Sequence, residues 1–175
     1  MRDWLLDEPK KSEDIFNLAL IAFLIEIGLL VVLIILVKLD LFPAFGDSAV
    51  SPRLTPLSLL ERLFLAFELS AQASISEEFV FRALPLIVAV RLTRGDLRVI
   101  SLVAIISSVL FGLGHGTASN ILIQGVGGII YSIVFLKCGG INGKFEKPFY
   151  IIVALHFLWD FSMMSFIALL PTSVL

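Results

Sequence analysis

The chain has 175 residues, of which 58% are apolar, a mean hydropathy of +1.01 and a formal net charge of −2. This apolar content is well above the roughly 45–50% of soluble domains, which indicates a protein that has lipid around much of its exterior. No basic stripe suitable for nucleic acid is present, and a single cysteine, Cys138, excludes an internal disulfide and a multi-cysteine metal site.

The first predicted elements are a polar N-terminal tail, residues 1–14, and an apolar run, residues 15–37. The run is long enough to cross a hydrocarbon core of about 30 Å and too long for the apolar part of a secretory signal, so we expect it to be retained. Glu26 lies in its middle. We expect this carboxyl to be protonated or hydrogen-bonded inside a helix bundle, with a direct role in chemistry as the alternative.

After a proline-containing connection, residues 38–57, the next segment has a helical pattern up to about Leu92. At 1.5 Å per residue this is ~54 Å, which is too long for one simple span. We therefore predict a break at residues 71–76, where small and polar side chains interrupt the apolar run. Ser74 and Glu77 match a capping box, so Ser74 would begin a new helix, and residues 59–69 would form a short, partly interfacial one. Pro85 is expected to kink the helix that follows.

Three further apolar segments, residues 97–113, 120–136 and 149–170, complete the chain. Glycines at 125, 127 and 128 permit close helix contact within or between chains. The pattern predicts an all-α polytopic membrane helix bundle with about five spans plus a short interfacial or broken helix. Residues 15–175 would form one membrane-embedded domain. Cys138, at the end of an apolar run, is expected to be an inert buried thiol.

The distribution of positive charge predicts the orientation. With the N-terminus in the cytoplasm, three Lys or Arg residues face the opposite side, Lys38, Arg53 and Arg62. The cytoplasmic side then holds Arg2, Lys10, Lys11, Arg91, Arg94, Arg98, Lys137, Lys144 and Lys147. This positive-inside bias favours a multi-pass protein of a prokaryotic plasma membrane with a cytoplasmic N-terminus, provided that residues 57–93 cross once.

Two adjacent carboxylates and an arginine stand out in the apolar chain. Glu78 and Arg82 are four residues apart, so on a helix they share a face and are expected to pair. Glu77 is rotated from Glu78 by about 100°, which leaves it available as a general base in a low-dielectric pocket. Ionisable groups at membrane depth are costly and therefore point to function.

Both histidines of the chain lie on later apolar segments. His115 ends the run Phe111-Gly112-Leu113-Gly114-His115, and His156 is four residues before Asp160, so this pair also shares a helical face. Counted along helices from the cytoplasmic charges, Glu78, His115 and His156 lie at ~20, ~25 and ~14 Å. These depths allow the three segments to meet in one polar site.

In this order, Glu77-Glu78-x-x-x-Arg82, Phe111-x-x-x-His115 and His156-x-x-x-Asp160 resemble the motifs of the CPBP family of intramembrane proteases. That family includes type II CAAX prenyl endopeptidases and bacteriocin-processing or Abi-type proteins. The resemblance covers about residues 57–170 and implies peptide-bond hydrolysis by a glutamic-type enzyme. It implies that Glu77 and His115 activate a water, that His156 and Asp160 stabilise the oxyanion, and that Glu78 and Arg82 form a structural pair.

The sequence departs from the family's commonest form at Asp160, where asparagine is usual. An ionised aspartate cannot donate a hydrogen bond to an oxyanion, so Asp160 would be protonated, orient His156 or bind a metal. We expect no metal or other cofactor. The alternative is zinc or another divalent metal held by Glu77, His115, His156 and Asp160, although no HExxH spacing is present.

These observations favour an intramembrane endopeptidase that cleaves a membrane-associated protein or peptide, often near its C-terminus. Its partners would be that substrate and the lipid bilayer. A non-proteolytic scaffold or immunity protein of the same family is one alternative, and a small proton-coupled transporter is another. A transporter would more often show paired halves with corresponding broken helices, which the sequence does not show.

Overall fold

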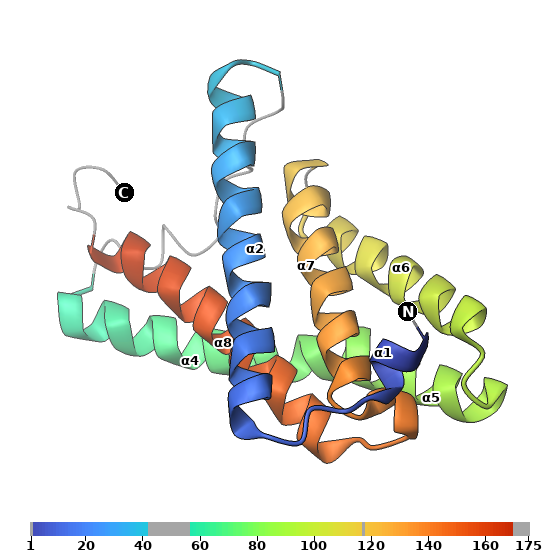
Figure 1. The fold of residues 1–175 in the computed structure, drawn as a ribbon. Coiled ribbons are helices and arrows are strands. Elements are labelled where there is room, and N and C mark those ends of the chain that lie inside the picture. The colour runs from blue at the N-terminus through green and yellow to red at the C-terminus, as the bar shows by residue number, and fades with distance from the viewer. Residues whose placement is uncertain (1, 42–56, 117, 170–175) are drawn as a thin grey trace.

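The computed structural model describes residues 2–41, 57–116 and 118–169, and within these ranges the chain is all-α, as predicted (Figure 1). In chain order, the helices are α1 (Arg2–Leu6), α2 (Ser12–Lys38), α4 (Leu59–Glu78), a π-helical turn (Phe79–Ala83), α5 (Leu84–Thr93), α6 (Leu97–Gly114), α7 (Ala118–Lys137), a 3₁₀ turn (Gly140–Asn142) and α8 (Glu146–Leu169). The strongest helix pairings join α4 to α8 and α6 to α7. These four helices form the body of the bundle, and α2 stands against α7 and α8.

By length and composition, α2, α6 and α8 are apolar enough to cross a membrane. A shorter apolar stretch, Ile121–Lys137, makes up most of α7. The first span is confirmed as one continuous helix. The count of about five spans stays a prediction, because three of the described helices meet both criteria.

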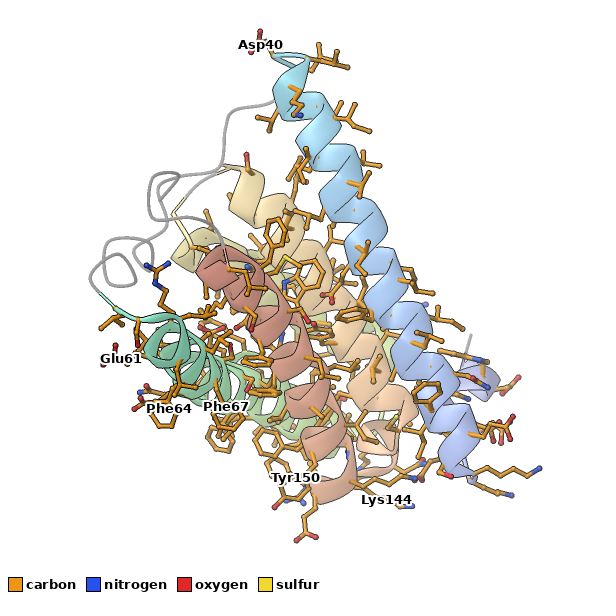
Figure 2. All side chains as sticks on the ribbon, turned by 90° about the vertical axis from the view of Figure 1, so that its left-hand side faces the viewer. Asp40, Glu61, Phe64, Phe67, Lys144 and Tyr150 are labelled. Atoms are coloured by element: carbon orange, nitrogen blue, oxygen red, sulfur yellow. The ribbon has the colours of Figure 1, made fainter. Side chains whose placement is uncertain are left out.

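Helix α2 shows how little of this chain is buried against protein. Its buried side chains are Ala22, Glu26 and Leu33, which lie along one narrow stripe, and most of its large apolar side chains are exposed. Figure 2 shows side chains projecting from α2 along its length, and Phe64 and Phe67 projecting outward from α4. An apolar surface of this extent requires lipid as its solvent.

The predicted break at residues 71–76 is wrong. Helix α4 runs without interruption from Leu59 to Glu78, and the capping box lies at its true start, where Ser58 and Glu61 cap each other. Ser74 is buried in mid-helix, where its hydroxyl donates to the carbonyl of Ala71. The polar residues that suggested a break are instead accommodated within the helix by such local hydrogen bonds.

The long segment is interrupted eight residues beyond the start of the expected break, at the π-helical turn Phe79–Ala83. Pro85 follows in the first turn of α5, where a missing N–H is tolerated best. The carbonyl of Phe81, within the turn, accepts a hydrogen bond from the Ser107 hydroxyl of α6. A neighbouring helix thus satisfies a backbone group at the interruption, as a low-dielectric environment requires.

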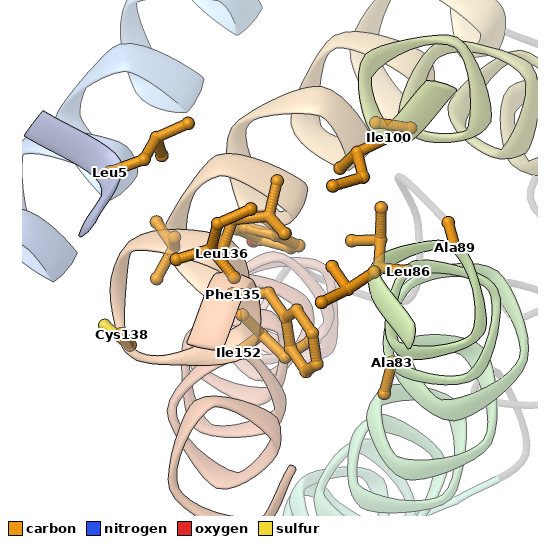
Figure 3. Close-up of a cluster of buried hydrophobic side chains, with 14 of the residues drawn as sticks. Leu5, Ala83, Leu86, Ala89, Ile100, Phe135, Leu136, Cys138 and Ile152 are labelled. Carbon is orange, nitrogen blue, oxygen red and sulfur yellow. The ribbon is translucent and has the colours of Figure 1, made fainter. Parts of the chain in front are cut away.

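A cluster of buried apolar side chains joins α5, α6, α7 and α8 at one end of the bundle (Figure 3). Phe135 lies at its centre, close to Leu86 and Ile152. Gly140 is required beside Phe135, because a Cβ there would lie 2.5 Å from the ring. Cys138 is fully buried, as expected, and its burial raises the pKa of the thiol to about 11, which is consistent with an inert thiol.

The N-terminal residues pack onto this same end. Leu5 joins the apolar cluster, and the Lys137 ammonium donates to the carbonyls of Trp4 and Asp7 while it lies 4.6 Å from the Trp4 ring centroid. Glu8 pairs with Lys144 at 2.7 Å and with Lys147 at 3.0 Å. Residues 2–9 therefore close one end of the bundle and bring its basic loop next to the start of α2.

Replacing Glu8 by glutamine is expected to loosen this attachment by less than about 1 kcal/mol, because the ion pairs are at the surface. The hydrogen bond from Lys144 holds the pKa of Glu8 below its ordinary value. The stabilisation is therefore complete at neutral pH and is lost as pH falls through the lowered value. Hydrogen–deuterium exchange of residues 3–8 should be faster in Glu8→Gln than in wild type at pH 7. The exposed Glu13→Gln is the control, and equal exchange in all three proteins would contradict the assignment.

Candidate active site

Glu78 and Arg82 form a completely buried ion pair across the start of the π-helical turn. Arg82 Nη1 lies 3.1 Å from Glu78 Oε1, and both side chains have no exposed surface. This confirms the pairing predicted from their spacing. A π-helical turn widens the helix locally and is frequent at functional sites, because it changes the direction in which side chains project.

The guanidinium of Arg82 packs between an aromatic ring and a glycine. Its Cζ lies 3.8 Å from the centroid of the Phe111 ring, which gives a desolvated cation–π contact. Gly128 of α7 leaves the space for the other side of the group, because a Cβ there would lie 2.5 Å from Arg82 Nη2. The side chain therefore ties α4, α6 and α7 together at one point.

His156 of α8 is placed between three carboxyl groups. Its Nδ1 lies 2.8 Å from Glu78 Oε1, while its Nε2 lies 3.3 Å from Asp160 Oδ2 and 3.7 Å from Glu77 Oε2. The predicted face shared by His156 and Asp160 is thus present. Glu78 pairs with both Arg82 and His156, a second contact that its helical spacing did not predict.

His115 lies at the C-terminal end of α6 and is exposed. Its Nδ1 is 2.9 Å from the carbonyl oxygen of Phe111, one of the last carbonyls of the helix. A carbonyl can only accept, so Nδ1 carries the proton in this contact and Nε2 is the basic nitrogen of the neutral ring. The helix end therefore sets the tautomer of His115.

A cavity of about 770 Å³ brings three of the predicted residues to one surface, Glu77, His115 and Asp160. Glu77 is 28% exposed in its side chain and Asp160 is 17% exposed, whereas the neighbouring Glu78 is fully buried. The two adjacent glutamates thus differ in their access to the cavity, as the 100° between them predicted. The rest of the lining is mostly apolar and comes from α2, α4, α7 and α8: Leu30, Ile34, Ala73, Ile123, Gln124, Trp159, Met163, Met164, Phe166 and Ile167.

Sequence reasoning missed two residues of this region. Gln124 is a half-buried amide on α7 in the cavity lining, and its position in the apolar run Ile121-Leu122-Ile123-Gln124 is the feature that marks it. Tyr131, also on α7, is buried next to the His156 ring. A tyrosine in an apolar helix is common in a core, so nothing in the sequence distinguished it.

The alternative metal set was Glu77, His115, His156 and Asp160. Among the described residues, no three His, Cys, Asp or Glu side chains are arranged to hold a metal ion. In the arrangement observed, each ring nitrogen of His156 faces a carboxyl oxygen.

Compared with protein-family models, the chain matches the one described as type II CAAX prenyl endopeptidase Rce1-like, over residues 59–162. No curated protein and no solved structure matches the chain. The matched range begins at the first residue of α4 and ends within α8, so it contains all seven named motif residues and omits α1 and α2.

Proposed function

Since the chain belongs to the Rce1-like family of type II CAAX prenyl endopeptidases, we propose that it is an intramembrane endopeptidase that hydrolyses a peptide bond in a membrane-associated protein or peptide, near its C-terminus. The observation that supports this activity best is the shared cavity of Glu77, His115 and Asp160, with His156 and the Glu78–Arg82 pair directly behind it. A scissile peptide bond in this cavity would reach the Glu77 carboxylate and the His115 imidazole while most of its surroundings exclude water.

In the proposed mechanism, Glu77 and His115 bind the attacking water. The Glu77 carboxylate takes one proton as the water attacks the carbonyl carbon, and the same carboxyl then gives that proton to the leaving amine. His115 Nε2 accepts the second hydrogen bond from the water and orients it. Both residues are on the cavity surface, which is the access that such a step needs.

The tetrahedral oxyanion requires hydrogen-bond donors, and an ionised Asp160 is not one. We propose that Glu78 orients the His156 ring through Nδ1, at 2.8 Å, and that the Nε2–H, which faces Asp160 at 3.3 Å, is shared with the oxyanion when substrate is bound. The Gln124 amide, in the lining of the same cavity, is proposed as a further donor to the substrate. In this scheme the reaction needs no metal.

The proposed membrane arrangement has a cytoplasmic N-terminus in a prokaryotic plasma membrane. It is supported by the packing of residues 2–9 against the basic loop that contains Lys144 and Lys147, which gathers positive charge at one end of the bundle. Buried Cys138 should resist maleimide reagents, so cysteines introduced singly at positions 10 and 40 can report the side of each loop.

The test is cleavage in liposomes of a quenched fluorescent peptide that ends in a prenylated CAAX sequence. Wild type should cleave it, and His115→Ala should lower kcat by about 10²-fold or more, in the range of general acid–base contributions. Activity should persist after dialysis against a strong chelator. Cleavage that His115→Ala leaves intact would contradict the proposed site, and cleavage that the chelator abolishes and zinc restores would replace the metal-free scheme.

A further inference from the structure

A buried carboxyl from outside the matched range reaches the polar region of the site. Glu26 of α2 is 5% exposed, and its Oε2 accepts a hydrogen bond of 2.8 Å from the hydroxyl of Tyr131 on α7. The contact joins residues 105 positions apart in the sequence. The expectation that Glu26 is hydrogen-bonded inside the bundle is thus confirmed, and its partner is Tyr131.

The helices are shaped to admit this carboxyl. At Gly127, one turn before Tyr131, an added Cβ would lie 2.6 Å from Glu26 Oε1. The glycine therefore allows a polar group to lie against the backbone of α7. Apolar packing at this position would join the two helices at a lower free-energy cost. Burying a carboxyl group between apolar helices costs free energy, so the contact points to a role other than holding α2 to α7.

The partner of Glu26 packs directly against the central histidine. The Tyr131 ring lies 5.7 Å from the His156 ring between centroids, inclined at 43°, and the Phe111 ring lies 6.0 Å from His156 at 87°. These two aromatic rings restrict the imidazole plane, while Glu78 and Asp160 hold its nitrogens. A hydrogen bond that fixes the Tyr131 ring consequently limits how far His156 can rotate.

We propose that Glu26 and Tyr131 are positioning residues of the site, with Glu26 fixing Tyr131 by its hydrogen bond and Tyr131 fixing the orientation of His156. The inference rests on the proposed function only for its kinetic consequence. It also gives α2 a part in the chemistry, although this helix lies outside residues 59–162.

The kinetic test uses four single variants in the liposome cleavage assay. Tyr131→Phe and Glu26→Ala should each lower kcat by about 10- to 100-fold, the loss expected from a small misplacement of a reacting group, with KM within about twofold of wild type. Glu26→Gln keeps an acceptor oxygen for the tyrosine and should keep kcat within about threefold. Ser132→Ala is the matched control, because this buried hydroxyl on the next residue of α7 donates only to the Gly128 carbonyl of its own helix.

The double variant Glu26→Ala with Tyr131→Phe should be no slower than the slower single variant, because both changes remove the same hydrogen bond. A kcat of the double variant that falls by the product of the two single losses would overturn the proposal. An unchanged kcat in Glu26→Ala with a lower melting temperature would also overturn it, because the contact would then only hold α2 to α7. Loss of activity in Glu26→Gln equal to that in Glu26→Ala would also overturn it.

A second measurement does not depend on cleavage. The chain has two histidines, so a tag-free protein labelled with 15N-histidine gives two sets of ring resonances, and His115→Gln assigns them. Tyr131→Phe and Glu26→Ala should shift the ring resonances of His156 and leave those of His115 in place, whereas Glu26→Gln and Ser132→Ala should leave both in place. Unshifted His156 resonances would overturn the proposal. Absence of cleavage by wild type would count against the proposed function alone.

Discussion

Glu77→Ala is expected to lower kcat at least about 10³-fold, because it removes the group proposed to take a proton from water and return it to the leaving amine. KM should change much less, since apolar side chains provide most of the cavity lining and make the larger contact with substrate. The measurement is the liposome cleavage assay, with protein that elutes as wild type in gel filtration.

Glu77→Gln distinguishes the loss of a base from the loss of side-chain volume. The amide keeps the size of the side chain and most of its contacts, but it cannot act as a base at neutral pH. It should therefore be as inactive as Glu77→Ala while it melts within a few degrees of wild type. The matched control is Glu68→Gln, which changes an exposed carboxyl on the same helix outside the cavity lining. A glutamine variant that retains a tenth or more of wild-type kcat would assign the base to another residue.

Arg82→Ala is expected to have the largest effect on stability, a loss of about 3–5 kcal/mol, because it leaves a buried carboxylate without its cation. It also removes the contact with the Phe111 ring and opens a void beside Gly128. Thermal unfolding in detergent should show the loss as a melting temperature far below that of wild type. The exposed Arg91→Ala, on the next helix, should unfold like wild type.

A paired replacement distinguishes a charge effect from a loss of volume. Glu78→Gln combined with Arg82→Met removes both charges and retains most of the side-chain volume, so it should recover at least half of the stability lost in Arg82→Ala. Activity should not return, because His156 Nδ1 then faces an amide in place of the Glu78 carboxylate. If the pair is as unstable as Arg82→Ala, the loss comes from the shape of the site and the ion pair is not its cause.

Helical spacing was a reliable guide to the site wherever it described neighbours on one helix. Glu78 with Arg82, and His156 with Asp160, are each four residues apart, and both pairs are in contact. The order of the motifs led to the family, which the match over residues 59–162 shows. The contacts between helices were not predictable in this way, because spacing along one segment says nothing about which face of another segment it meets. Tyr131 and Gln124 were missed for that reason.

The wrong break at residues 71–76 has a related cause. Small and polar residues there were interpreted as an interruption, but Ser74 and Ser76 are compatible with a helix when a hydroxyl donates to a carbonyl of the preceding turn. The actual interruption at Phe79–Ala83 contains no glycine or proline that would mark it in the sequence. Its backbone is supported by Ser107 of α6, and a contact 26 residues away leaves no local pattern.

The residues that line the cavity lie partly inside and partly outside the range that matches the family. Its reactive side chains come from the matched range. Leu30 and Ile34 come from α2, which that range omits, and the end of α8 beyond the range contributes Met163, Met164, Phe166 and Ile167. An exchange or divergence of the first helix among related enzymes would therefore reshape the volume available to a substrate without altering the chemical groups that attack it. Substrate selectivity among related proteins can therefore change through substitutions in α2, provided that Glu26 is retained.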